Sequence, residues 1–109
     1  MMTSYTVEGG RLLVRDGVQP PELLRAAVWI DLLNPTPEEE RIVQQALRVE
    51  IPTREEMQEI ESSSRLYRED DFLFLTAPFL YGAETDEFGS TAITFVLGSA
   101  QLVTVRYAT

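Results

Sequence analysis

The sequence predicts an α/β domain built on a mixed sheet of about six or seven strands with three short helices. Three observations indicate this class. Segments that favour strands occupy the start of the chain and its second half. Two well-marked helix starts, at Thr36 and Thr53, lie between these parts. The chain has 109 residues and is 44% hydrophobic, so it has the size of one domain and enough apolar side chains for a core.

The first third of the chain predicts a strand pair, a short helix and a buried strand. Two short strands, residues 4–7 and 11–15, flank a turn at Gly9 and Gly10. A brief helix opens at Pro20. Residues 28–33 are mostly apolar and β-prone, which indicates a strand inside the sheet.

The two following helices are defined by their first residues. Thr36 is the expected N-cap of the longer helix, and Glu39 completes a capping box. Thr53 and Glu56 repeat this pattern at the start of a second, short helix, which ends at the serine run 62–64. The longer helix carries apolar residues at helical spacing, namely Ile42, Val43, Ala46 and Leu47.

The second half of the chain predicts two hairpins. Residues 65–68 pair with 72–80, and after an acidic loop at 82–89, residues 91–97 pair with 102–107. Strand 91–97 is apolar on both faces, so the sheet needs a layer on each side. The helices suffice for one face only. We therefore expect a partner, or more of the same polypeptide, on the other face.

The composition excludes most catalytic chemistry. The chain has no cysteine and no histidine, and all nine basic residues are arginine. Thiol nucleophiles, imidazole bases, zinc–thiolate sites and Schiff-base lysines are therefore excluded. We expect a protein that is not an enzyme, with no catalytic residues.

The net charge of −9 points to cations as partners. A surface of this sign repels phosphate backbones, so nucleic acid is not an expected ligand. No apolar run approaches the ~20 residues that span a bilayer, and the start of the chain does not resemble a signal peptide. The chain taken alone is expected to be soluble and cytoplasmic.

The acidic residues concentrate in the helical region. Residues 38–61 hold eight of the eighteen acids, and Glu55, Glu56 and Glu59 crowd one helical turn. Carboxylates without softer ligands suit hard cations such as Mg²⁺ and Ca²⁺. The alternative is that these acids only stabilise helix starts through the macrodipole and the capping boxes. Glu55 has no capping role and is the freer candidate.

An acidic loop, residues 84–89, has some of the spacing of an EF-hand calcium loop. It fails as one, because its fifth position is Phe88 and its twelfth is Phe95 instead of a bidentate glutamate. A solvated hairpin loop is the expected structure.

Two segments resemble the CorA-type magnesium and cobalt transporters. The first is WIDLLNPT, residues 29–36, which precedes a Glu-rich helix. The second is TREEMQEIESSSRLY, residues 53–67, which precedes an acidic turn and an apolar strand. The closing strand LVTVRY, residues 102–107, also fits. These segments favour CorA over the related zinc transporter ZntB.

The resemblance implies a larger assembly. CorA-type transporters are homopentamers with a cytoplasmic funnel of α/β/α domains, a stalk helix and two transmembrane helices per subunit. Residues 1–109 would form a single domain, the N-terminal part of this cytoplasmic region, on the cytoplasmic side of the cell membrane. The stalk, the transmembrane helices and the Gly-Met-Asn pore signature are absent from these residues.

The resemblance also implies how cations act. Divalent ions between neighbouring cytoplasmic domains hold the channel closed and leave when intracellular Mg²⁺ falls. By position, Glu55 and Glu56 would supply one side of such a metal site, with Mg²⁺ as the first ligand and Co²⁺ as the second. The opposing acid comes from a neighbouring stalk, so this chain would bind Mg²⁺ weakly, at about millimolar concentration or above. The alternative function is a stand-alone acidic protein–protein interaction module without a metal role.

Overall fold

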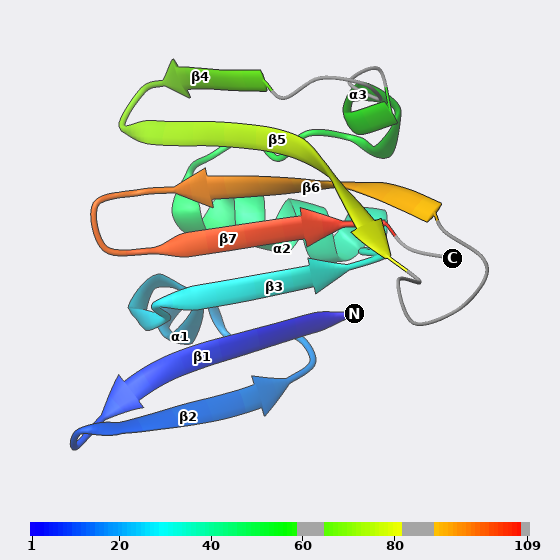
Figure 1. Cartoon of the computed structure of the whole chain (residues 1–109). Coiled ribbons are helices and arrows are strands. Elements are labelled where there is room, and N and C mark those ends of the chain that lie inside the picture. Colours follow the sequence, from blue (N-terminus) through cyan, green and yellow to red (C-terminus); the bar gives the residue numbers. More distant parts are fainter. Residues whose placement is uncertain (59–64, 82–88, 108–109) are drawn as a thin grey trace.

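The computed structural model describes residues 1–58, 65–81 and 89–107 (Figure 1). The described strands form one mixed sheet in the order β2-β1-β3-β7-β6-β5-β4. Only β3 and β7 pair in parallel among these seven strands. The predicted α/β class and strand number are confirmed. The strands are β1 (Met2–Glu8), β2 (Arg11–Asp16), β3 (Trp29–Leu33), β4 (Arg65–Glu69), β5 (Phe72–Tyr81), β6 (Gly89–Leu97) and β7 (Leu102–Arg106).

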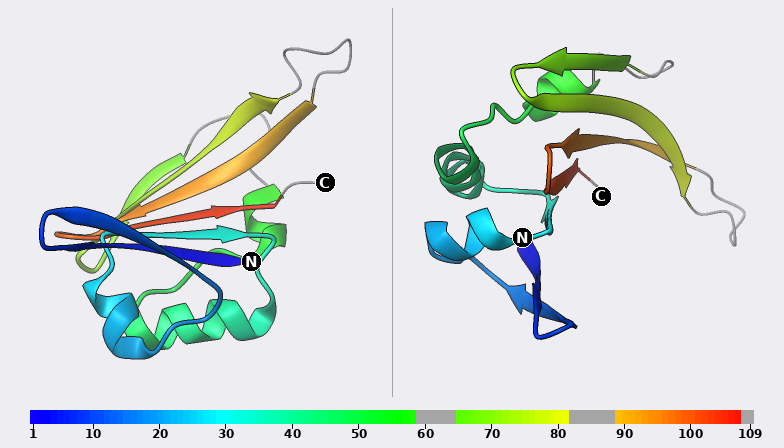
Figure 2. Two further views of the ribbon diagram at one scale, coloured as in Figure 1. Left: turned by 90° about the horizontal axis from the view of Figure 1, so that it is seen from below. Right: turned by 90° about the vertical axis from the view of Figure 1, so that its left-hand side faces the viewer.

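The helices lie together on one face of the sheet. These are α1 (Pro21–Ala26), α2 (Pro37–Leu47) and α3 (Arg54–Gln58). In the left-hand view of Figure 2 the strands run above and the helices lie beneath them. The expectation that the helices would suffice for one face is confirmed in the described residues.

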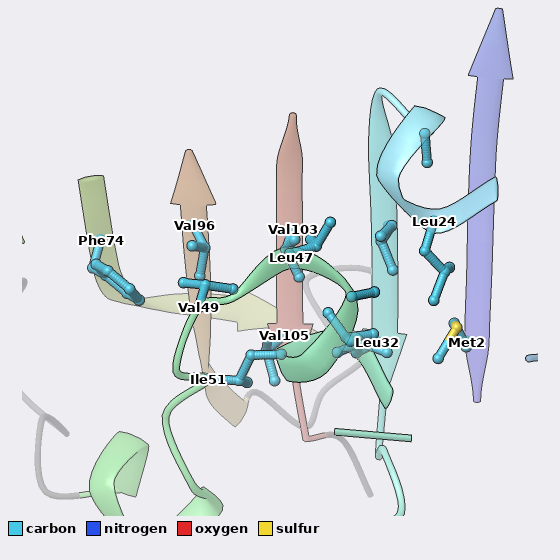
Figure 3. Close-up of a cluster of buried hydrophobic side chains, with 14 of the residues drawn as sticks. Met2, Leu24, Leu32, Leu47, Val49, Ile51, Phe74, Val96, Val103 and Val105 are labelled. Carbon is cyan, nitrogen blue, oxygen red and sulfur yellow. The ribbon is translucent and has the colours of Figure 1, made fainter. Parts of the chain in front are cut away.

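The hydrophobic core fills the space between the sheet and these helices. Register aligns Ile30, Val103, Val96 and Phe74 side by side across four central strands. The helices contribute Leu24, Val43, Leu47 and Met57, and the segment after α2 adds Val49 and Ile51 (Figure 3 shows much of this cluster). Each of these side chains is buried. Because the helices share this core, it fixes their positions on the sheet.

The opposite face, which we call the open face, is also largely apolar. Side chains alternate along a strand, so the residues between the core positions point to this face. One row across the sheet consists of Tyr5, Trp29, Leu102, Leu97 and Leu73. Six large apolar side chains of the open face are 40–64% exposed, namely Val7, Leu12, Val14, Leu66, Phe79 and Leu97.

The capping box of α2 forms as predicted. The Glu39 backbone N–H donates to Thr36 Oγ1 at 3.1 Å, and the Thr36 N–H donates to Glu39 Oε1 at 2.9 Å. The Met1 ammonium also donates to Glu39 Oε1, at 3.1 Å. Burial alone would raise the pKa of Glu39, but these hydrogen bonds and the nearby positive charge lower it below its ordinary value of 4.5. The Glu39 carboxylate therefore favours the folded state only while it is ionised.

The aromatic side chains are divided between the two faces of the sheet. Phe74 is buried in the core. Trp29 lies instead on the open face, where it stacks on Tyr5 with ring centroids 4.4 Å apart. Phe79 is also on the open face and is exposed. A strand that is apolar on both sides does not reveal which side the helices will cover.

Pro78 lies within β5 without breaking the sheet. It pairs with Ala92 of β6 on one side. On the other side the β4 pairing ends at Thr76, so the missing N–H of Pro78 faces no β4 residue. The extent of β4 therefore explains why a proline is tolerated there.

The two faces of the sheet should differ in their contribution to stability. Leu32→Ala, on the covered face and 0% exposed, should lower the free energy of unfolding by about 2–5 kcal/mol, because it leaves a cavity. The matched Leu97→Ala, on the open face and 50% exposed, should cost less than about 1 kcal/mol. Urea unfolding measures both values. Equal losses would mean that the open face is packed as tightly as the core.

The Glu39 charge should make the free energy of unfolding fall as the pH becomes acidic. Glu39→Gln keeps a capping-box side chain and removes the charge, so it should cost about 0.5 kcal/mol at pH 7. Because the folded pKa lies below the unfolded one, this contribution is complete above pH 4.5 and is lost as the pH falls through the folded pKa. Urea unfolding of both proteins from pH 7 to pH 3 tests this. A difference that grows toward low pH would contradict it.

Candidate cation site on helix α3

Helix α3 begins at a second capping box. The Thr53 N–H donates to Glu56 Oε1, and the Glu56 N–H donates to Thr53 Oγ1, both at 3.2 Å. The Met57 N–H donates to the Thr53 carbonyl oxygen at 3.0 Å, and the Met57 side chain is buried in the core. The cap fixes the start of the helix, and Met57 holds it against the sheet.

This geometry separates the two predicted metal ligands. The Glu56 carboxylate turns back to the N-terminus of α3, where it accepts the Thr53 hydrogen bond. Glu55 is exposed, and it makes no hydrogen bond or ion pair with any other described residue. Successive residues on a helix are about 100° apart around its axis, so Glu55 projects in a different direction from Glu56. Both acids are exposed, and Glu55 is the one of the two whose carboxylate makes no hydrogen bond in the described residues.

The described acids provide at most part of a cation site. No group of three or more aspartate or glutamate residues comes together in residues 1–58, 65–81 and 89–107. Glu59, Glu61 and the acidic loop 84–88 lie outside the described residues. Mg²⁺ often keeps several waters and uses only one or two carboxylates, whereas Ca²⁺ needs six to eight oxygen ligands. An exposed Glu55 therefore fits a hydrated Mg²⁺ ion better than an all-protein Ca²⁺ site.

Tyr107, directly after β7, connects α2 and α3 to the sheet. Its hydroxyl donates a hydrogen bond to Glu40 Oε1 of α2. The guanidinium of Arg54, the first residue of α3, lies over its ring, 5.7 Å from the centroid. Burial, the hydrogen bond to Glu40 and the negative charges of Glu40 and Glu55 raise the pKa of Tyr107 well above its usual range. The phenol therefore keeps its proton and stays the hydrogen-bond donor to Glu40.

No motif or periodic pattern in the sequence singles out Tyr107. Its only sequence signal is an aromatic residue at the end of the last strand, and many core residues share that signal. The contact with Glu40 spans 67 positions in the chain, and no local pattern predicts such a contact.

A second polar group lies on the open face, at the parallel pair β3–β7. Trp29 Nε1 donates to Thr104 Oγ1 at 2.9 Å, and that hydroxyl donates to Asp31 Oδ1 at 2.7 Å. Arg106 Nη2 donates to Asp31 Oδ2 at 3.3 Å. Asp31 therefore has an arginine partner on the neighbouring strand. Because both oxygens of Asp31 are engaged, this carboxylate is a poor candidate for a metal ligand.

The arrangement of strands and helices is similar to that of two solved structures of a magnesium transporter. The complete structure of the CorA magnesium transporter from Methanocaldococcus jannaschii superposes with a TM-score of 0.65, over 100% of this chain and 32% of that one. The soluble domain of the same transporter superposes with a TM-score of 0.62, over 99% of this chain and 40% of that one. Both are 13% identical in sequence, so they establish the fold alone.

Sequence identity to other proteins shows common descent in addition to this shared fold. The magnesium transport protein CorA of Escherichia coli (strain K12) is 33% identical over 106 residues, and that of Sodalis glossinidius is 32% identical over the same length. No family model matches the chain. The chain is homologous to CorA magnesium transport proteins, and the resemblance found in the sequence is confirmed.

The match covers 97% of this chain but only 33% of the E. coli protein, so the chain spans about a third of the length of these relatives. The matched proteins are transport proteins, which agrees with the expectation that this chain is not an enzyme. Within the described residues, no helix has both the length and the apolar character needed to cross a membrane.

The two neighbouring glutamates of α3 should differ in their effect on the helix. Glu56→Ala removes half of the capping box and should destabilise α3 locally by about 1 kcal/mol. Glu55→Ala makes the same chemical change one position earlier and should cost only a few tenths of a kcal/mol, roughly the macrodipole contribution. Amide hydrogen exchange at Met57 reports this local stability. Equal exchange rates in the two variants would contradict the distinct roles.

Proposed function

We propose that this chain is the N-terminal part of the cytoplasmic domain of a CorA-type magnesium channel, and that it senses divalent cations through carboxylates. The observation that carries the proposal is the 33% identity to CorA magnesium transport proteins over 97% of the chain. The fold agrees with this assignment, because the soluble domain of a CorA transporter superposes on nearly the whole chain.

The open face supports a domain that is completed by other polypeptide. Its six exposed apolar side chains form a larger unpartnered surface than single scattered residues would. The relatives are about three times as long as this chain, so they contain further segments that can cover such a face. Residues 1–109 are then one domain unit of a longer subunit, which assembles into a pentamer at the cytoplasmic side of the membrane.

Glu55 is the principal cation ligand in this proposal, with Glu56 as the second. Glu55 is exposed and has no competing hydrogen bond in the described part of the chain, whereas Glu56 already uses its Oε1 to accept the Thr53 hydrogen bond and offers mainly its Oε2 to a cation. One available carboxylate binds a hydrated Mg²⁺ ion weakly, so the remaining ligands would come from a neighbouring subunit. Mg²⁺ is the proposed physiological ligand, and Co²⁺ is the second candidate.

A half-site, in which one subunit supplies only part of the cation's ligands, can couple ion binding to assembly of the subunits. A cation that binds between two subunits stabilises the arrangement in which their carboxylates approach each other, because it offsets their repulsion. Loss of the cation releases that constraint and shifts the population toward looser arrangements. The channel would therefore close at high intracellular Mg²⁺ and open when Mg²⁺ falls.

A second candidate function is a protein–protein interaction module without a metal role. The open apolar face favours it, because such a surface suits a protein partner. The two candidates differ at Glu55 and Glu56, which only the first one requires.

Magnesium titration of the chain separates these functions. Amide chemical shifts of α3 should move with a dissociation constant of about 1 mM or weaker, and Glu55→Gln with Glu56→Gln should abolish this change. Glu38→Gln, at an exposed glutamate in the first turn of α2, is the matched control and should leave the titration unchanged. Submicromolar binding, or a response that persists without both carboxylates, would sink the half-site model.

A further inference from the structure

We propose that Tyr107 is a positioning residue that connects helix α3, and with it Glu55, to the end of the central strand β7. Three contacts made by Tyr107 carry this inference. They are the hydroxyl–Glu40 hydrogen bond, the Arg54 guanidinium over the ring, and a hydrogen bond of 2.6 Å from Thr91 Oγ1 to the Tyr107 carbonyl oxygen. Together they join one residue to α2, α3 and β6.

Helix α3 needs such an anchor because it is short. Its described part spans Arg54–Gln58, and helices of this length are not stable in isolation. The Thr53 capping box satisfies groups within the helix itself and does not bind it to the sheet. The attachment comes from burial of Met57 on one side and from the Arg54–Tyr107 contact on another.

Two hydrogen bonds hold Tyr107 beneath Arg54. The Thr91 hydrogen bond fixes the Tyr107 backbone beside β6, and the Glu40 hydrogen bond fixes the ring direction from α2. Tyr107 follows Arg106, which pairs with Leu33 of β3 and Ile93 of β6 in the middle of the sheet. The ring is therefore held at the end of β7, the middle strand in the described sheet order, and the Arg54 guanidinium lies over it.

This arrangement ties the position of Glu55 to the place where the chain leaves the sheet. Glu55 is the neighbour of Arg54, and its charge already acts on the Tyr107 hydroxyl. A movement of α3 must change the Arg54–Tyr107 contact, and a displacement of Tyr107 leaves α3 attached through Met57 alone among these two contacts. The importance of this link for cations rests on the proposed function, whereas the positioning of α3 does not.

Amide hydrogen exchange of the 109-residue chain tests the inference. Tyr107→Leu removes the ring beneath Arg54, so the Glu56 and Met57 amides should exchange at least about five-fold faster. Tyr107→Phe keeps the ring and loses the Glu40 hydrogen bond, so its effect should be smaller but measurable. Tyr5→Phe removes a hydroxyl on the open face and should change nothing in α3. The Ile30 and Val103 amides, in the sheet centre, report global unfolding.

A double variant distinguishes positioning from general destabilisation. In an Arg54→Gln background, Tyr107→Leu should no longer accelerate exchange in α3, because the contact it removes is already absent. An equal acceleration in that background, or α3 exchange within two-fold of the parent chain in Tyr107→Leu, would overturn the inference. If Tyr107→Leu unfolds the sheet centre, the single variant Arg54→Gln tests the proposal instead. Arg54→Gln should then accelerate amide exchange in α3, and unchanged exchange would refute the proposal.

Millimolar Mg²⁺ separates this inference from the proposed function. A parent chain whose α3 amides do not respond to Mg²⁺ contradicts cation sensing, and the exchange results without Mg²⁺ still decide the role of Tyr107. A Mg²⁺ response that is present in the parent chain and reduced several-fold in Tyr107→Leu supports both.

Discussion

The parallel pairing of β3 with β7 is the constraint on which the rest of the structure depends. It joins the N-terminal strands β2, β1 and β3 to the C-terminal strands β7, β6, β5 and β4, and it is the only strand pairing between these two halves of the described sheet. Ile30 and Val103 pack on its covered side. The hydrogen bonds from Thr104 and Arg106 to Asp31 reinforce the same pair on its open side, across 73 and 75 positions of the chain.

The helices complete this arrangement on one side only. Their shared core explains why α1, α2 and α3 lie on the same face, and why the other face keeps exposed leucine, valine and phenylalanine side chains. In the right-hand view of Figure 2, β5 and β6 curve away from α1 and α2, so the sheet bends toward the open side. A face of this kind suits a domain that functions as part of a larger protein, in agreement with relatives three times its length.

The candidate site illustrates how one residue type serves two purposes in consecutive positions. Glu56 stabilises the start of α3 through Thr53, and this use engages one of its carboxylate oxygens. Glu55, which is equally exposed, has no such task in the described residues. In the proposed site, Glu56 therefore stabilises the helix and Glu55 is left for the cation. The contact of Arg54 with Tyr107 connects the helix that carries both glutamates to the end of β7.

The sequence by itself determined the features that depend on local chemistry. Capping boxes at Thr36 and Thr53, the hairpins and the one-sided helical cover follow from residue types at short spacing, and the motif in residues 53–67 indicated homology to CorA. Only the tertiary structure decided which face the helices cover, and therefore that Trp29 lies on the open face. It also decided the contact of Tyr107 with Glu40, because strand pairing brings together residues that no periodic pattern relates.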